Sequence, residues 1–147
     1  QADAAATVRG GAPYKDLSGS VLFFAVHGGV LVCARFTGLP KSTELCHTPI
    51  FAFHIHENGD CTQDNGTFSG TGGHYNPSEC LHPNHTGDMP PLFGAGDEAF
   101  SVFLTNRFRI PEIIGRSVIV HAGVDDFTTQ PAGNAGEKIA CGVIFRV

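Results

Sequence analysis

The sequence predicts an all-β protein, folded as a Greek-key antiparallel β-barrel or sandwich with long loops. Three observations predict this class. Short runs rich in Val, Ile and Phe recur along the chain, 19 glycines and 9 prolines separate them, and no stretch shows a sustained helical apolar period with capping residues. Short strands punctuated in this way are typical of antiparallel barrels and sandwiches. The 147 residues suit one domain with a real hydrophobic core.

The first elements can be assigned in order. Residues 1–15 are rich in Ala and Gly and show little pattern, so we expect a flexible N-terminal arm before a domain that spans 16–147. Two apolar runs, 21–26 and 30–36, flank His27-Gly28-Gly29, which is typical of a β-hairpin. The remaining predicted strands share the same enrichment in apolar residues: 50–56, 99–104, 117–121 and 139–147.

Other segments lack a strand pattern. Residues 107–114 are expected to hold a short helical turn at most, because Pro111 limits its length. The two long segments 57–97 and 122–137 are expected to be loops. Structureless loops of this length within a small domain usually carry function.

Composition excludes several classes of function. The formal net charge is −5 and the chain has no basic stripe, which argues against nucleic-acid binding. No apolar run approaches the length of about 18 residues that crosses a membrane. None of the five cysteines lies in a CxxC pair, which argues against a zinc ribbon or a thioredoxin-like protein. Five cysteines in a chain of this size favour an oxidising compartment with at least one disulfide. An oxidising, extracytoplasmic setting follows, whether periplasmic, cell-surface or secreted.

Histidines dominate the loops and the strand ends. Six of the eight form an ordered series, and Asp88 and Asp125 each follow a member of it by three or four residues; the six are His54, His56, His74, His82, His85 and His121. Neutral imidazole is the commonest metal ligand among side chains. Six imidazoles with interleaved aspartates are enough for two metal ions that share one ligand.

The donor types separate two sites. His54 and His56 leave the same face of one strand, and His121, which ends another, can complete a set of imidazoles that suits Cu(II). A second set suits tetrahedral zinc and consists of His82, His85 and Asp88. Each of the two sets needs one further donor. His74 lies between the two sets in the sequence. A deprotonated imidazole can bind one metal through each nitrogen, so His74 can serve both.

These residues resemble a known family. The sequence is similar to the copper/zinc superoxide dismutases over roughly 18–147, with short loops like those of bacterial members. The matching motifs occur in the family's order: Phe53-His54-Ile55-His56-Glu57, Gly73-His74-Tyr75-Asn76-Pro77, His85-Thr86-Gly87-Asp88, Ile114-Gly115-Arg116-Ser117-Val118-Ile119-Val120-His121, Asp125-Asp126, and Gly133-Asn134-Ala135-Gly136 leading into Ala140-Cys141-Gly142-Val143-Ile144.

The resemblance implies roles for individual residues. Asp125 would hydrogen-bond one copper histidine and one zinc histidine, and Cys61 and Cys141 would form a disulfide. His74 would be catalytic, giving up copper on reduction and carrying a proton. The implied ligands are His54, His56, His74 and His121 for copper, and His74, His82, His85 and Asp88 for zinc.

The sequence departs from the family pattern at one position near the copper ligands. The family's active-site arginine lies three residues before the second bridging cysteine, where this chain has Lys138. The positive charge is kept, but the planar fork of donors is lost. The segment between His121 and Cys141 is also short and carries few charges. We therefore expect Lys138 to be a catalytic residue that guides the anionic substrate.

The expected activity is dismutation of superoxide to oxygen and hydrogen peroxide by Cu(II)/Cu(I) cycling, with structural zinc. A non-enzymatic copper-binding or copper-delivery module on the same fold is the main alternative, since fold alone does not fix function. An enzyme that works with an empty zinc site is a second alternative. A homodimer and a monomer both stay open. His27 and His47 match no ligand position, and the pairing of the other cysteines is unassigned: Cys33, Cys46 and Cys80.

Overall fold

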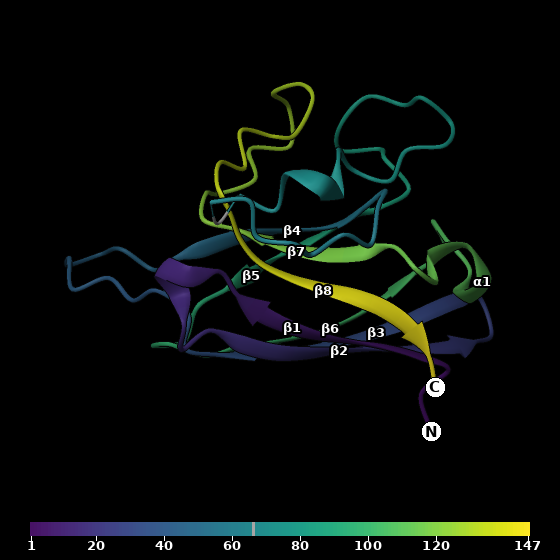
Figure 1. The fold of residues 1–147 in the computed structure, drawn as a ribbon, viewed down its shortest axis with the longest axis horizontal. Helices are drawn as coiled ribbons and strands as arrows, with labels where there is room; N and C mark the ends of the chain where they lie inside the picture. Colours follow the sequence, from purple (N-terminus) through teal and green to yellow (C-terminus); the bar gives the residue numbers. More distant parts are fainter. Residues whose placement is uncertain (66) are drawn as a thin grey trace.

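Within residues 1–65 and 67–147, which the computed structural model describes, eight strands pair into one antiparallel sheet that curls on itself (Figure 1). The order across the sheet is β5-β4-β7-β8-β1-β2-β3-β6. The strands are β1 (Ala4–Gly10), β2 (Ser18–Val26), β3 (Gly29–Thr37), β4 (Ile50–His56), β5 (Asp88–Phe93), β6 (Ala99–Thr105), β7 (Ser117–His121) and β8 (Lys138–Arg146). The expected all-β class is confirmed.

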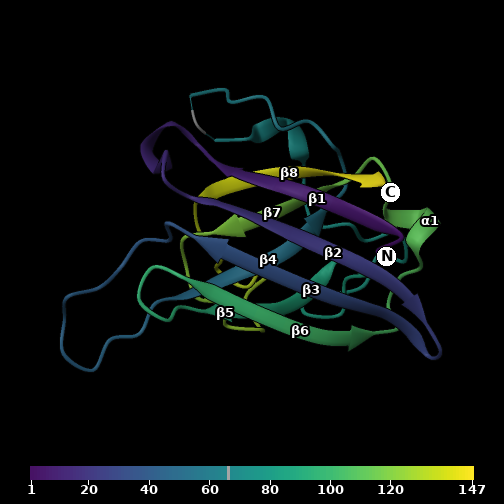
Figure 2. The ribbon, with the colours of Figure 1, turned by 90° about the horizontal axis from the view of Figure 1, so that it is seen from below.

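The connections make the sheet a Greek key. β6 pairs with β3 and β7 pairs with β4, so the chain crosses between the two halves of the sheet after β3, after β5 and again after β6. The two edge strands, β5 and β6, approach each other on the far side of the curl (Figure 2). Their approach encloses the core between the inner faces of the strands.

The hairpin and the helical turn that the sequence predicts are both present. β2 and β3 are joined by His27 and Gly28, and Gly28 takes the positive φ of +89° that a residue without Cβ adopts without strain. α1 (Ile110–Ile113) is one turn with Pro111 in its first turn, where a missing N–H costs nothing. Two short 3₁₀ turns complete the regular structure, η1 (Ala12–Tyr14) and η2 (Ser69–Thr71).

The expectation of a flexible arm at 1–15 is wrong. Strand β1 lies inside the sheet, paired on one side with β2 and on the other with β8. Ala4, Ala6 and Val8 point inward and are almost fully buried. Alanine carries little strand propensity, so the three consecutive alanines at the start of β1 give a weak signal, and pairing with two neighbours decides the structure.

The expectation of a continuous loop over 57–97 is also wrong, because it contains β5. This strand includes Pro90 and Pro91, which argue against a strand when the sequence is read alone. Proline cannot donate to a ladder and is confined to sheet edges, and β5 is an edge strand that pairs only with β4 among the described residues.

The long loops gather on one side of the fold. The segments that precede β5 and that connect β7 to β8 lie together above β4 and β7 (Figure 1). This brings the candidate ligands of the loops onto the same region as those of the strands. Among the helices in the described part of the chain, none is long and apolar enough to cross a membrane.

Candidate metal centre

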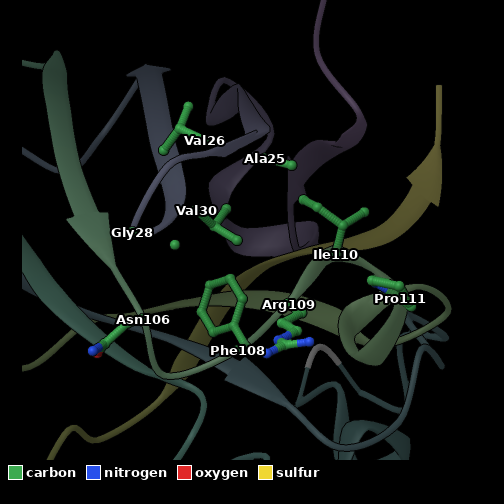
Figure 3. A pocket seen from close by; sticks show the side chains of 10 residues that line it. Ala25, Val26, Gly28, Val30, Asn106, Phe108, Arg109, Ile110 and Pro111 are labelled. Carbon is green, nitrogen blue, oxygen red and sulfur yellow. The ribbon is translucent and has the colours of Figure 1, made fainter.

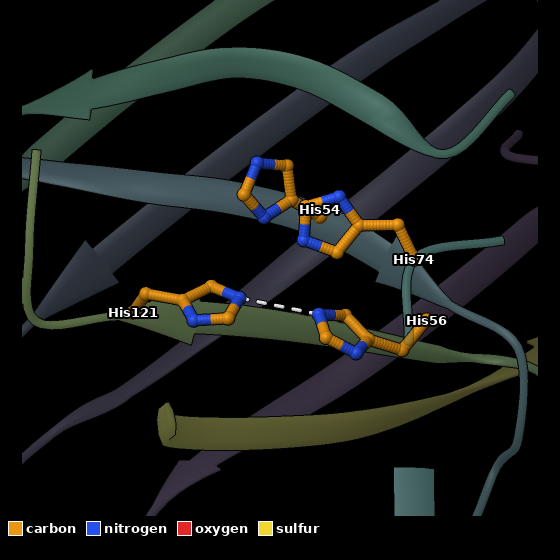
Figure 4. Close-up of side chains that lie close together, drawn as sticks. All are labelled: His54, His56, His74 and His121. Atoms are coloured by element: carbon orange, nitrogen blue, oxygen red, sulfur yellow. Dashed lines mark hydrogen bonds between the residues drawn. The ribbon is translucent and has the colours of Figure 1, made fainter. Parts of the chain in front are cut away.

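Paired strands position the first three imidazoles. His54 and His56 come from β4, and His121 ends the neighbouring strand β7; all three are almost fully buried. In the antiparallel ladder between these strands His54 pairs with Ile119 and His56 pairs with Ser117, so His121 follows the paired residues at the other end of β7. His74 comes from the loop that precedes β5 and forms an isolated bridge with His56. The four rings converge on a common space (Figure 4).

Backbone carbonyls fix the orientation of two rings. Nδ1 of His56 lies 2.9 Å from the carbonyl oxygen of Gly72, and Nδ1 of His121 lies 3.2 Å from that of Gly136. A carbonyl only accepts, so each Nδ1 carries the proton and each Nε2 offers a lone pair. The two Nε2 atoms face each other at 3.1 Å (Figure 4). Two ligand nitrogens are therefore preset in the neutral, unprotonated form that binds a metal.

Asp125 orients one ring from each donor set. Its Oδ2 lies 2.8 Å from Nε2 of His54, and its Oδ1 lies 2.7 Å from Nε2 of His82. Burial opposes ionisation of this carboxyl, but the hydrogen bonds from His54 and His82 outweigh that effect and hold its pKa below the ordinary value. Each histidine then presents Nδ1, not Nε2, to the centre.

A second donor set surrounds Asp88. Nδ1 of His74 lies 2.8 Å from Oδ1 of Asp88 and 3.1 Å from Nδ1 of His85. Oδ2 of Asp88 lies 3.0 Å from Nδ1 of His82 and 3.3 Å from Nδ1 of His85. Zinc–ligand bonds of about 2.0 Å give a tetrahedron with edges of about 3.3 Å, so these separations fit four ligands of one zinc ion.

Among the residues that the structure describes, three buried side-chain nitrogens have no hydrogen-bond partner: Nδ1 of His54, Nε2 of His74 and Nδ1 of His82. His82 Nδ1 is close to Asp88 but does not meet it in hydrogen-bond geometry. Buried polar atoms are rarely left unpaired, and each exception needs a cause. All three belong to the two donor sets, and metal ions bound in those sets would satisfy all three. The residues therefore fit two ions, with His74 facing both.

Distances alone also group His54 with the second set. Two groups of four residues each have one donor atom per residue within 4.8 Å of the others. The first group is His54, His56, His74 and His121, and the second is His54, His74, His82 and Asp88. Because Nε2 of His54 is held by Asp125, this ring has one free nitrogen and can bind only one ion. His85 fits the second set better, since its Nδ1 is the one that lies near His74 and Asp88.

Burial keeps the imidazoles neutral. It lowers the pKa of His54 to about 4 and that of His121 to about 3, and it holds the pKa of His56 well below the ordinary value. Neighbouring imidazoles lower these values further, because two adjacent imidazolium charges repel. At neutral pH the rings are unprotonated and ready to bind metal.

Two side chains that the sequence analysis missed hold the loop around the second set. Gln130 exchanges hydrogen bonds with the backbone of His82, through Oε1 at 2.9 Å and Nε2 at 2.8 Å. The guanidinium of Arg107 donates to the carbonyl oxygens of Pro83 and His85. Neither residue belongs to a recognisable motif, and both lie far in sequence from the backbone they bind.

A cavity of about 330 Å³ opens over the first donor set. It is lined by His56, His74 and His121, and by Lys138 at the start of β8. The ammonium of Lys138 donates to Oγ1 of Thr71 at 2.9 Å, and burial lowers its pKa. His85 also lines it, so this is a space for a small molecule next to four imidazoles and one positive charge.

A larger cavity, of about 540 Å³, lies elsewhere, between the β2–β3 hairpin and α1 (Figure 3). Its lining is apolar apart from Asn106 and Arg109, and none of the candidate ligands reaches it. Size alone would favour this cavity. The converging, unsatisfied donors place the chemistry at the smaller one.

A disulfide between Cys61 and Cys141 ties the loop after β4 to β8, as the resemblance implies. The other three cysteines are free: Cys33, Cys46 and Cys80. His27 and His47 are exposed and lie outside both donor sets, in agreement with their assignment to the surface. The disulfide agrees with an oxidising setting.

Comparison with known proteins agrees with this centre. The family model for copper/zinc superoxide dismutase (SODC) matches residues 17–144. Superoxide dismutase [Cu-Zn] 2 of Aquifex aeolicus is 35% identical over 144 residues, covering 88% of this chain and 80% of that protein. The extracellular superoxide dismutase [Cu-Zn] of Mus musculus is 36% identical over 140 residues, covering 88% of this chain and 53% of that protein.

Solved structures show the same fold. A SOD-like protein from Bacillus subtilis superposes with a TM-score of 0.77 at 24% identity, covering 95% of this chain and 96% of that one. At that identity the likeness concerns the fold alone. The family model and the Aquifex aeolicus relative at 35% identity decide the membership. The chain belongs to the copper/zinc superoxide dismutase family.

Proposed function

We propose that this protein is a superoxide dismutase that uses copper and zinc. The observation that carries the proposal is the double role of His74. Its Nδ1 lies among the donors around Asp88, while its Nε2 is buried, has no partner and lies in the other set. One imidazole between two complete donor sets is the arrangement that two metals with a shared ligand require.

The proposed copper ligands are His54 Nδ1, His56 Nε2, His74 Nε2 and His121 Nε2. The proposed zinc ligands are His74 Nδ1, His82 Nδ1, His85 Nδ1 and an oxygen of Asp88. Donor chemistry supports this division, because imidazoles alone suit copper and three nitrogens with one oxygen suit zinc. Copper bound there supplies reversible one-electron redox chemistry, by which two superoxide ions and two protons become oxygen and hydrogen peroxide.

The side chains supply access and a proton. His74 lines the cavity, and its buried Nε2, which has no hydrogen-bond partner, is the atom at which a proton can be held and released close to the substrate. Lys138 lines the same cavity and gives a protein of net charge −5 a local positive charge for an anion. Asp125 and the two backbone carbonyls keep the imidazoles in one orientation, so the site needs little rearrangement when an ion binds.

The direct test is catalysed decay of superoxide by the protein loaded with one copper and one zinc. The control is His121→Ala, which removes one proposed copper ligand and leaves the second donor set intact. Fast decay that is lost in the control supports the proposal. Decay no faster than in buffer, with both metals bound, would leave a non-enzymatic copper-binding module.

We also propose an extracytoplasmic setting, in which the protein is secreted or held outside the cytoplasm. The Cys61–Cys141 disulfide supports it, because such bonds persist in oxidising compartments. A relative named as extracellular also supports it. Fractionation of the source cells, followed by detection of the protein outside the cytoplasm, tests the proposal.

A homodimer is the proposed assembly, and the outer face of the sheet supports it. Leu22, Cys33 and Val102 lie directly opposite one another on β2, β3 and β6 and face outward. The next outward row is equally apolar: Phe24, Leu31 and Leu104. Contiguous apolar surface of this kind marks interaction sites, and antiparallel sheets otherwise turn polar residues to water.

Analytical ultracentrifugation tests this assembly. We expect a dimer for the native protein and a monomer for Val102→Lys, while Lys41→Glu in an exposed loop stays dimeric. A monomeric native protein over the micromolar range would exclude the dimer.

A further inference from the structure

The ammonium of Lys138 has three oxygen acceptors around it. Nζ lies 2.9 Å from Oγ1 of Thr71, 3.0 Å from the carbonyl oxygen of Gly72 and 3.4 Å from that of Phe68. An ammonium group has three N–H donors, so these contacts occupy all of them. All three acceptors are neutral, and the positive charge of Lys138 is held in place without being cancelled.

Thr71 is the side chain among these acceptors. It is fully buried, in η2, and its hydroxyl donates to the carbonyl oxygen of Phe68 at 2.7 Å. With its proton committed there, Oγ1 can only accept, and it presents a lone pair to Lys138. The hydroxyl of Thr71 is therefore oriented by the backbone before it meets the ammonium.

The charge it holds lies at the candidate metal centre. Gly72 accepts from Lys138 and also from Nδ1 of His56, so the ammonium and the imidazole share one carbonyl oxygen. Lys138, His56 and His121 line the same cavity. A lysine side chain is long and flexible, and it has no planar fork to fix its position as arginine has. A fixed acceptor is what keeps its charge beside the cavity.

We propose that Thr71 is a positioning residue, which holds the ammonium of Lys138 where it attracts small anions to the copper site. This inference rests on the proposed function in one respect, namely that Lys138 guides the anion. Because its N–H donors are occupied, Lys138 acts on an anion through the electrostatic field of its ammonium group. Thr71 fixes the position of that group. This positioning role requires both the lysine at position 138 and the hydroxyl of Thr71 that accepts its hydrogen bond.

The experiment compares four variants with the native protein, each loaded with copper and zinc: Thr71→Val, Thr71→Ser, Lys138→Met and the double variant Thr71→Val/Lys138→Met. The probe is azide, whose binding to Cu(II) is read from the visible absorption. Azide binding needs no turnover, so it separates this proposal from the dismutase activity, which is measured in parallel. Metal content and circular dichroism establish that each variant is folded and loaded.

We expect the dissociation constant of azide to rise about threefold to tenfold in Thr71→Val, and to return to the native value in Thr71→Ser. In the Lys138→Met background, Thr71→Val should have no further effect. The superoxide rate constant should follow the same pattern and lose most of its dependence on ionic strength in Thr71→Val.

Three outcomes would overturn the proposal: unchanged azide affinity in Thr71→Val, an equal loss in the Lys138→Met background, or no recovery in Thr71→Ser. If Thr71→Val does not fold, NMR of ¹⁵N-lysine in the zinc-loaded native protein decides. A held ammonium shows a slowly exchanging Nζ signal for Lys138 that Thr71→Ser preserves. Fast exchange in the native protein would contradict the role of Thr71.

Discussion

Oδ2 of Asp125 lies 2.8 Å from Nε2 of His54, and this contact decides which nitrogen of His54 faces the metal centre. With the proton on Nε2, Nδ1 is left as a buried lone pair without a partner. The other oxygen of Asp125 does the same for His82 in the second donor set. One carboxylate thus sets the protonation pattern of both sets at once.

Asp125→Asn should weaken the binding of both metals. The asparagine side chain keeps one oxygen that can accept from the N–H of one imidazole. Its amide nitrogen can only donate, so it faces the N–H of the other imidazole without forming a hydrogen bond. Loss of such an outer partner typically costs about 10- to 100-fold in metal affinity. Competition with chelators measures both affinities, and Asp126→Asn, next in the chain and facing the loop threonines, is the matched control. Equal affinities in the two variants would contradict the role of Asp125.

His82→Ala should remove zinc and lower the dismutase activity. The variant deletes one of the four zinc donors and leaves three, namely His74, His85 and Asp88. We expect zinc affinity to fall by more than the roughly 100-fold cost of losing an outer partner. His27→Ala, in the exposed hairpin, should change neither zinc affinity nor activity. Full activity in zinc-free His82→Ala would favour an enzyme that works with copper alone.

The metal-free protein should lose stability as the pH falls below 6.5. The folded-state pKa of His54 is about 4 and that of His121 about 3, against 6.5 when unfolded, because burial disfavours the charged rings. The unfolded chain therefore takes up protons first, and the contribution present above pH 6.5 is lost as the pH falls toward 3. Each proton contributes a slope of about 1.4 kcal/mol per pH unit.

Urea unfolding of the chelator-treated protein between pH 4.5 and 7.5 checks this dependence. We expect the free energy of unfolding to rise from pH 4.5 to about pH 6.5 and to level off above it. The protein loaded with both metals should unfold at higher urea at each pH, because the ions bind the neutral rings. A flat profile for the metal-free protein would show that the rings are not buried as described.

Removing the disulfide should lower the free energy of unfolding. The bond joins cysteines 80 residues apart, and the chain-entropy model gives roughly 4.5 kcal/mol for a loop of that length. Cys61→Ser/Cys141→Ser should therefore unfold at lower denaturant, and the loop that carries Thr71 should exchange its amides faster. Cys46→Ser, at an exposed free cysteine, is the control and should unfold like the native protein.

Lys138→Met should slow the reaction with superoxide by about tenfold at low ionic strength, with little difference left at high salt. The reason is the loss of the positive charge that lines the cavity of a negatively charged protein. Lys41→Met, in an exposed loop, leaves the cavity unchanged and serves as the control. Stopped-flow decay across a salt series measures both variants. A rate independent of residue 138 would exclude it as the anion guide.

The sequence alone determined the fold class and the set of candidate ligands. The many β-branched and aromatic residues of strands such as β3 and β7 predict those strands, and the type and order of the histidines indicate the ligands. These signals are local in the sequence, so they can be recognised without knowledge of the tertiary structure. The donor types were also sufficient to separate an imidazole set from a set that contains a carboxylate.

Only the tertiary structure decided how those residues work together. β1 and β5 form because neighbouring strands pair with segments whose own patterns, alanines in one and prolines in the other, are weak or contrary. The nitrogen that each imidazole offers depends on partners distant in the chain, as in the contact of His121 with Gly136. The hydroxyl of Thr71 meets Lys138 across 67 residues. Such contacts are products of packing, and no local period encodes them.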